Sequence, residues 1–199
     1  MTLFHRFIVA SLLLLAGWPL SALAHTGVHA GLDGFTAGFV HPFTGADHLA
    51  AMVAVGLWSA LAARRWQDML AAPAAFMAML LAGAALGRIG VSVPAVEPVI
   101  GASLLILGLL VITRWRLPMP AAIVLAGGFA LFHGHAHGHE LAAAADATLV
   151  LAGMVAASLM LHGTGIALGA SFRNAPPWLS KVAGLLVTVF GGALLGAPV

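Results

Sequence analysis

The sequence predicts an all-α membrane protein with six transmembrane helices after a cleavable signal peptide, the first mature helix being broken at His41-Pro42. Two properties of the 199-residue chain support this fold class. Hydrophobic residues make up 62% of the chain and charged residues only 7%, whereas a soluble domain carries about 25% charged residues. The apolar residues also run in stretches of about 20, which is the length that crosses a bilayer as a helix.

The N-terminal 24 residues have the pattern of a signal peptide. Arg6 supplies the positive start, "FIVASLLLLAG" is a short apolar core, and small residues stand at Ala22 and Ala24, as signal peptidase requires. Cleavage after Ala24 leaves His25 as the mature N-terminus, outside the cytoplasm. The chain then divides into a signal peptide, 1–24, and a single six-helix transmembrane domain, 25–199. An uncleaved first helix is the alternative.

Six apolar stretches follow the signal peptide, and the connections between them are too short to form a separate domain. We expect helices at about 35–61, 70–88, 95–113, 119–141, 147–170 and 179–197. Five pairs of glycines stand four residues apart, a spacing that lets helix backbones approach closely, and they favour a compact bundle. These pairs are Gly34/Gly38, Gly83/Gly87, Gly134/Gly138, Gly165/Gly169 and Gly192/Gly196.

The basic residues predict the orientation, because cytoplasmic connections of membrane proteins carry an excess of lysine and arginine. With the mature N-terminus outside, only Arg88 falls in an outer connection. The other six fall in inner connections: Arg64, Arg65, Arg114, Arg116, Arg173 and Lys181. We therefore expect a protein of the bacterial inner membrane with both termini periplasmic.

Two histidines and an aspartate interrupt the first apolar stretch, at His41, Asp47 and His48 in the pattern H-x5-D-H. Ionisable groups inside a membrane are costly and usually mark a pathway or a site. Pro42 disfavours helical geometry at His41, so we expect a broken helix in which Asp47 and His48 begin the second half. Broken helices bind ions in transporters. A proline kink with satisfied core histidines is the alternative.

The segment "FHGHAHGHE" at 132–140 places a second polar group in the fourth stretch. On a helix His133, His137 and Glu140 share one face, a plausible ligand set of two imidazoles and a carboxylate. His135 and His139 lie roughly opposite, either at the outer interface or as a loose metal antenna. Counting the rise per residue, we expect His41 and His133 at similar depth in the outer half of the membrane, with Asp47 and His48 one to two turns deeper.

Two further histidines are weaker candidates for metal ligands. His162 lies deep in the fifth stretch, where a lone histidine is more often a hydrogen-bonded core group. His25, as the mature N-terminus, offers an α-amine and an imidazole together, although a solvated terminus is equally compatible with its position. Cysteine is absent, which excludes thiolate ligands and disulfides. The chain has no G-x-x-x-x-G-K-[ST] segment for ATP and no basic stripe for nucleic acid.

The two motif segments resemble those of the HupE/UreJ family of small membrane permeases. "HPFTGADH" matches the family's H-x5-D-H, and Phe132, His133, Gly134, Ala136, Gly138 and Glu140 match its F-H-G-x-A-x-G-x-E segment. The resemblance extends over the whole chain. It implies transport of a divalent metal, usually Ni²⁺ and in some relatives Co²⁺, and a link to hydrogenase or urease maturation. It implies no enzymatic activity and no prosthetic group.

From the positions of these side chains we expect a path of histidine, aspartate and glutamate that carries the ion toward the cytoplasm. The metal ligands expected in this chain are His41, Asp47, His48, His133, His137, Glu140, His25 and His162. A membrane protein that binds metal without transporting it is the alternative function, as are a metalloenzyme and a bis-histidine haem protein. The sequence predicts no oligomeric state.

Overall fold

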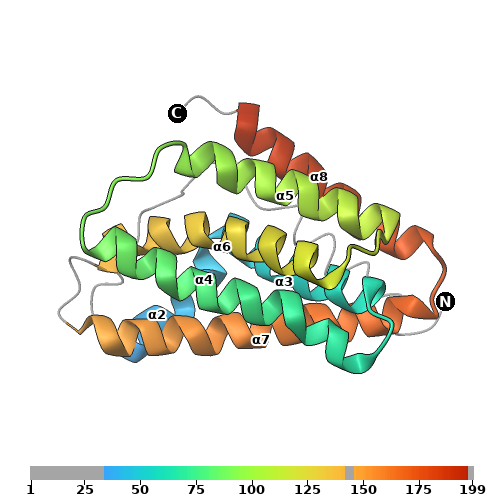
Figure 1. Cartoon of the computed structure of the whole chain (residues 1–199), viewed down its shortest axis with the longest axis horizontal. Coiled ribbons are helices and arrows are strands. Elements are labelled where there is room, and N and C mark those ends of the chain that lie inside the picture. The colour runs from blue at the N-terminus through green and yellow to red at the C-terminus, as the bar shows by residue number, and fades with distance from the viewer. Residues whose placement is uncertain (1–33, 142–145, 197–199) are drawn as a thin grey trace.

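The computed structural model describes residues 34–141 and 146–196, with the backbone alone at 139–141, and this part of the chain is all helix and short connections (Figure 1). The helices are α2 (Gly34–Thr44), α3 (Ala46–Ala62), the 3-10 helix η1 (Trp66–Leu70), α4 (Ala71–Arg88), α5 (Val96–Thr113), α6 (Met119–Leu141), α7 (Ala147–Arg173) and α8 (Trp178–Gly196). Five spans are long and apolar enough to cross a membrane, and the bent pair α2 and α3 makes a sixth. The protein is therefore multi-pass. The predicted signal peptide and His25 lie outside the described residues.

The break in the first span lies at Gly45, three residues beyond the predicted position at His41-Pro42. Pro42 is buried inside α2, because a proline removes only its own bond to the carbonyl four residues earlier and the helix then continues to Thr44. At Gly45 the backbone is extended, with φ −89° and ψ 104°, and α2 and α3 meet there at a bend of 80°. Asp47 and His48 begin the second half, as predicted.

The helices pack in close pairs, α4 with α6, α5 with α8, and α7 with both α2 and α3 (Figure 1). Four of the five predicted glycine pairs lie at these crossings. On α4 and α6 the pairs Gly83/Gly87 and Gly134/Gly138 face each other so closely that a Cβ on Gly134 would stand 2.0 Å from the Leu80 carbonyl oxygen. Gly192 and Gly196 are the exception, with open space around them.

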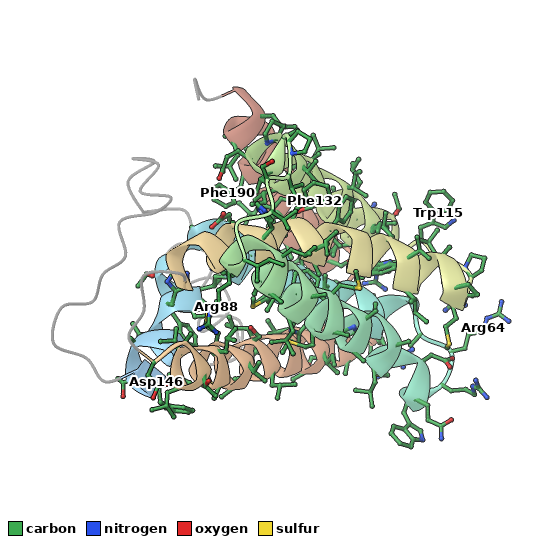
Figure 2. All side chains as sticks on the ribbon, turned by 60° about the vertical axis from the view of Figure 1, so that its left-hand side comes forward. Arg64, Arg88, Trp115, Phe132, Asp146 and Phe190 are labelled. Atoms are coloured by element: carbon green, nitrogen blue, oxygen red, sulfur yellow. The ribbon has the colours of Figure 1, made fainter. Side chains whose placement is uncertain are left out.

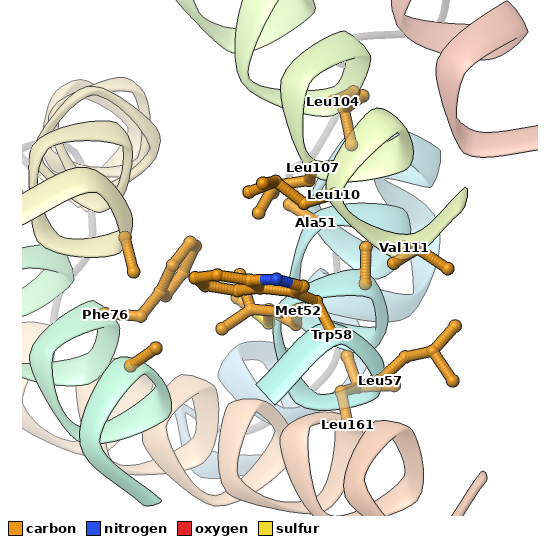
Figure 3. Close-up of a cluster of buried hydrophobic side chains, with 14 of the residues drawn as sticks. Ala51, Met52, Leu57, Trp58, Phe76, Leu104, Leu107, Leu110, Val111 and Leu161 are labelled. Carbon is orange, nitrogen blue, oxygen red and sulfur yellow. The ribbon is translucent and has the colours of Figure 1, made fainter. Parts of the chain in front are cut away.

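A hydrophobic core fills the space between α3, α4 and α5, and its largest members are the rings of Trp58 and Phe76 (Figure 3). Both are buried, at 2% and 0% exposure. The Trp58 indole N–H donates to the carbonyl of Trp115, 2.9 Å away. This bond attaches the connection after α5 to the last turns of α3.

The two ends of the bundle differ in charge. The connections 63–70, 114–118 and 174–177 lie together at one end, which we name the arginine end (right in Figure 1). Figure 2 shows Arg64 and Trp115 at this end and Arg88 with Asp146 at the opposite end. The basic residues predicted to face the cytoplasm are thus gathered at the arginine end of the bundle.

Candidate metal site

The break in the first span brings three polar side chains together at the junction of α2 and α3. His41 stands in the last turn of α2, and Asp47 and His48 stand in the first turn of α3, where the helix dipole favours a negative group. The Asp47 carboxylate Oδ1 accepts a hydrogen bond from His48 Nδ1 at 3.0 Å. This bond fixes the His48 ring and directs Nε2 toward α6, where it lies 3.5 Å from the carbonyl oxygen of His133.

Helix α6 supplies the other half of this group. His41 Nε2 and His137 Nδ1 are 2.9 Å apart and share one hydrogen bond. The His48 ring lies 4.0 Å from that of His137 and 4.8 Å from that of His133, centre to centre. We name these five side chains the histidine cluster: His41, Asp47, His48, His133 and His137. The last four are all at most 8% exposed, so the cluster is inside the bundle.

The glycines of α6 determine which way its histidines point. Each cluster histidine of α6 directly precedes a glycine that packs on α4, and successive residues on a helix are about 100° apart. His133 and His137 therefore lie beside the α4 contact and face the α2–α3 break. His135 faces elsewhere, and its Nε2–H donates to the Val91 carbonyl at 2.6 Å, so it is a bonded, buried group.

Ser103 of α5 selects the tautomer of His133. Its hydroxyl donates to the Ile100 carbonyl at 2.7 Å, so the oxygen must accept from His133 Nε2, 3.0 Å away. A neutral His133 then carries its lone pair on Nδ1. That atom is buried and, among the described residues, has no hydrogen-bond partner. Metal-binding histidines characteristically donate their other N–H to a fixed acceptor in this way.

His162 lies outside the histidine cluster, and its ring contacts Phe76, which also contacts His133. The Phe76 ring is 5.8 Å from the His133 ring and 5.1 Å from the His162 ring. His162 Nδ1–H donates to the Ser158 carbonyl at 2.8 Å, which leaves the lone pair on Nε2. Within the described part of the chain, neither this Nε2 nor the Ser158 hydroxyl has a hydrogen-bond partner. His162 is thus a second buried imidazole with a free lone pair.

The predicted ligands pair with different partners from those expected. His41 lies beside His137 instead of level with His133, and His48 reaches both histidines of α6. The 80° bend between α2 and α3 is the reason, because the expected depths were counted along one straight helix axis. The side chain of Glu140 and all of His25 lie outside the described residues. Among residues 34–138 and 146–196, no three histidine or acidic side chains already surround one point at metal-binding distance.

Comparison with known proteins identifies the family. The family model described as HupE / UreJ protein matches residues 12–194. The chain belongs to the HupE/UreJ family. It is also 42% identical to Protein HupE of Rhizobium leguminosarum bv. viciae over 178 residues, which are 89% of this chain and 91% of that protein. No solved structure matches the chain. The HupE/UreJ family is associated with uptake of nickel or cobalt for hydrogenase and urease, and its members are transporters or accessory proteins.

Two residues next to the cluster escaped the sequence analysis. Ser103 is a small polar residue in the middle of a largely apolar helix, and this polarity could have marked it in the sequence. Only the fold shows that it contacts His133. Phe76 carries no signal, because a phenylalanine in an apolar helix is ordinary core. The donor set itself suits the metals associated with the HupE/UreJ family, since imidazole nitrogen with some carboxylate oxygen is typical of Ni²⁺ sites.

Proposed function

We propose that this HupE/UreJ chain carries a divalent metal ion, Ni²⁺ in the first place and Co²⁺ as the alternative, across the inner membrane toward the cytoplasm. The observation that carries the proposal is the histidine cluster, in which three buried imidazoles, one buried carboxylate and the half-buried His41 gather around a break in a spanning helix. Such groups inside a membrane are expensive and are kept where an ion passes. The metal is cargo, and its binding is transient.

The donors suggest an order of passage. Glu140 and His137 would receive the ion near the outer end of α6, and His41, His48 and Asp47 would hold it at the break. His133 Nδ1 and His162 Nε2 are the next free lone pairs, and Phe76 contacts both rings. Neutral imidazoles with few carboxylates bind a divalent ion without trapping it. An inside-negative potential assists entry by about 2.3 kcal/mol per charge per 100 mV.

Transport is tested with the purified chain in vesicles that hold a fluorescent metal indicator. Adding NiCl₂ outside should raise the internal signal, and competition by Co²⁺, Zn²⁺ or Cu²⁺ should rank the ions. A protein that binds nickel in detergent but does not fill the vesicles would be a metal-binding protein only, which would refute the proposal.

The orientation in the membrane can be tested with single cysteines, since the chain has none of its own. We expect cysteines at the arginine end, in Gln67→Cys, Leu117→Cys and Ala175→Cys, to resist an impermeant maleimide in intact spheroplasts, because the excess of arginine favours the cytoplasm. Ser92→Cys, in the connection at the opposite end, is the control and should be labelled. Labelling of the first three from outside would reverse the orientation.

The tautomer of His133 gives a second prediction. Ser103→Ala removes the acceptor for Nε2–H, so His133 no longer has its lone pair fixed on Nδ1. We expect nickel uptake at limiting metal to fall by about 10-fold to 100-fold, the usual effect of losing a group that orients a metal ligand. Ser171→Ala is the matched control, because among the described residues its hydroxyl bonds to the Ala167 carbonyl of its own helix and to no histidine. Equal uptake by the two variants at equal membrane abundance would contradict a role for Ser103.

A further inference from the structure

A hollow opens at the arginine end of the bundle, beside the end of α3, whereas Asp47 and His48 stand at the start of that helix. Its volume is about 430 Å³, and six residues at the end of α3, in the connections after α3 and α5, and at the end of α7 line it: Leu61, Ala63, Arg64, Arg114, Arg116 and Arg173. Four of the six are arginines and none is acidic. The preference of basic residues for the cytoplasmic side accounts for an excess of them at this end. It does not require four arginines to line one hollow. Arg65 and Lys181 belong to the same end and do not line it.

Two of the four arginines are held in place by the fold. Arg114 donates to the Ser180 hydroxyl at 3.0 Å and to the Phe172 carbonyl at 3.1 Å. Arg173 donates to the carbonyl of Ala63. Arg114 also adopts a left-handed backbone, φ 51°, which an L residue keeps only when its surroundings impose it. The hollow is therefore a built feature, whereas Arg64 and Arg116 are exposed at its rim.

The chemistry of the lining selects an anion with several oxygens. Guanidinium groups bind phosphate through paired N–H donors, and four positive charges with no acidic residue among the lining favour an anionic occupant. Three exposed tryptophans lie at the same end of the bundle, namely Trp66 at 68%, Trp115 at 62% and Trp178, the first residue of α8, at 46% exposure. Tryptophans at the ends of spanning helices lie at the level of the lipid headgroups. The phosphate that meets this hollow is thus the phosphate of a lipid.

We propose that the arginine hollow is a binding site for the headgroup of an anionic phospholipid in the inner leaflet. Basic pockets between spanning helices on the cytoplasmic side have this role in other membrane proteins. The bound phosphate neutralises charge that would otherwise oppose a cation leaving at this end. That consequence rests on the proposed transport, whereas the binding does not depend on what the chain carries.

The test measures thermal stability of the purified full chain in neutral detergent as phosphatidylglycerol is added. The variant Arg64→Gln with Arg116→Gln removes two rim charges whose side chains make no hydrogen bond or ion pair with the described residues. Its control, Arg65→Gln with Lys181→Gln, removes the same charge from the same end outside the hollow. We expect phosphatidylglycerol to stabilise the parent and the control alike. The rim variant should need at least about 10-fold more lipid, because each lost guanidinium removes a charge-assisted hydrogen bond to the phosphate that a charge outside the hollow does not make.

Three outcomes would overturn the proposal. Equal loss of the lipid effect in both double variants would show a diffuse surface charge instead of a site. An equal effect of phosphatidylcholine on the parent would show that the site does not select an anion. Equal stabilisation by inorganic phosphate at the same concentration would assign the hollow to a soluble ligand. Each comparison uses the variant's own melting temperature without lipid as its reference, so a general loss of stability does not imitate the result.

Discussion

Replacing either His41 or His137 by alanine is expected to reduce nickel uptake to less than about a tenth, and replacing both is expected to reduce it little further. The two rings share a hydrogen bond of 2.9 Å between α2 and α6, so they would serve one position of the ion. Residues that act as a unit are not additive when they are removed together. The measurement is the initial rate of radioactive nickel uptake in cells at equal membrane abundance of each variant.

A matched control for this pair stands on the same helix. His135→Gln changes a buried histidine of α6 that faces Val91, and glutamine keeps an N–H donor for that carbonyl. We expect uptake within about threefold of the parent, because His135 is not directed at the break. Uptake of the double variant equal to the product of the two single effects would contradict a shared position. Loss in the His135 variant as large as in the others would place the path elsewhere.

The same reasoning extends to the remaining members of the proposed path. Asp47→Ala also removes the acceptor that orients the His48 ring, and His48→Ala removes the ring that contacts both histidines of α6. Together with His133→Ala and Glu140→Ala, each is expected to nearly abolish uptake at normal abundance. His162→Ala is expected to do less, because His162 contacts Phe76 and lies outside the cluster.

The sequence predicts the spans well because each is an apolar stretch of membrane length, and this property is local. The boundaries of α4, α5 and α8 agree with the prediction to within a residue, and α6 agrees at both ends. The motif residues can also be recognised within a short stretch of sequence, and their placement on one face of α6 follows from helical spacing alone.

The sequence could not predict the position of the break or the register of the helices. Pro42 is the stronger helix breaker on general grounds, but one missing hydrogen bond does not end α2, and the extended residue is Gly45. The bend of 80° that follows depends on how α2 packs against α7. That bend decides that His41 meets His137, and the packing of α5 decides that Ser103 meets His133. Such contacts join residues far apart in the chain, so no local pattern encodes them.

The same substitution, glycine to alanine, is expected to have opposite effects at two positions of α6. Alanine at Gly134 places a Cβ 2.0 Å from the carbonyl oxygen of Leu80, and a backbone atom cannot move aside as a flexible side chain can. The helices α4 and α6 must separate, which we expect to cost at least about 3 kcal/mol. Alanine at Gly128 meets nothing within 4 Å, and its better helix propensity should add about 0.5 to 1 kcal/mol.

The consequence for function follows from the position of Gly134 beside the cluster. His133 directly precedes it in α6, so a displacement of α6 from α4 also moves His133 and His137 relative to the break. We expect Gly134→Ala to lower the melting temperature of the purified protein and to reduce nickel uptake per molecule that remains in the membrane. Gly128→Ala should retain full uptake and melt at the same or a higher temperature. Normal stability and uptake in the Gly134 variant would show that α4 and α6 do not cross at these glycines. The position assigned to the histidine cluster would then be wrong as well, because the same crossing fixes the direction of its α6 members.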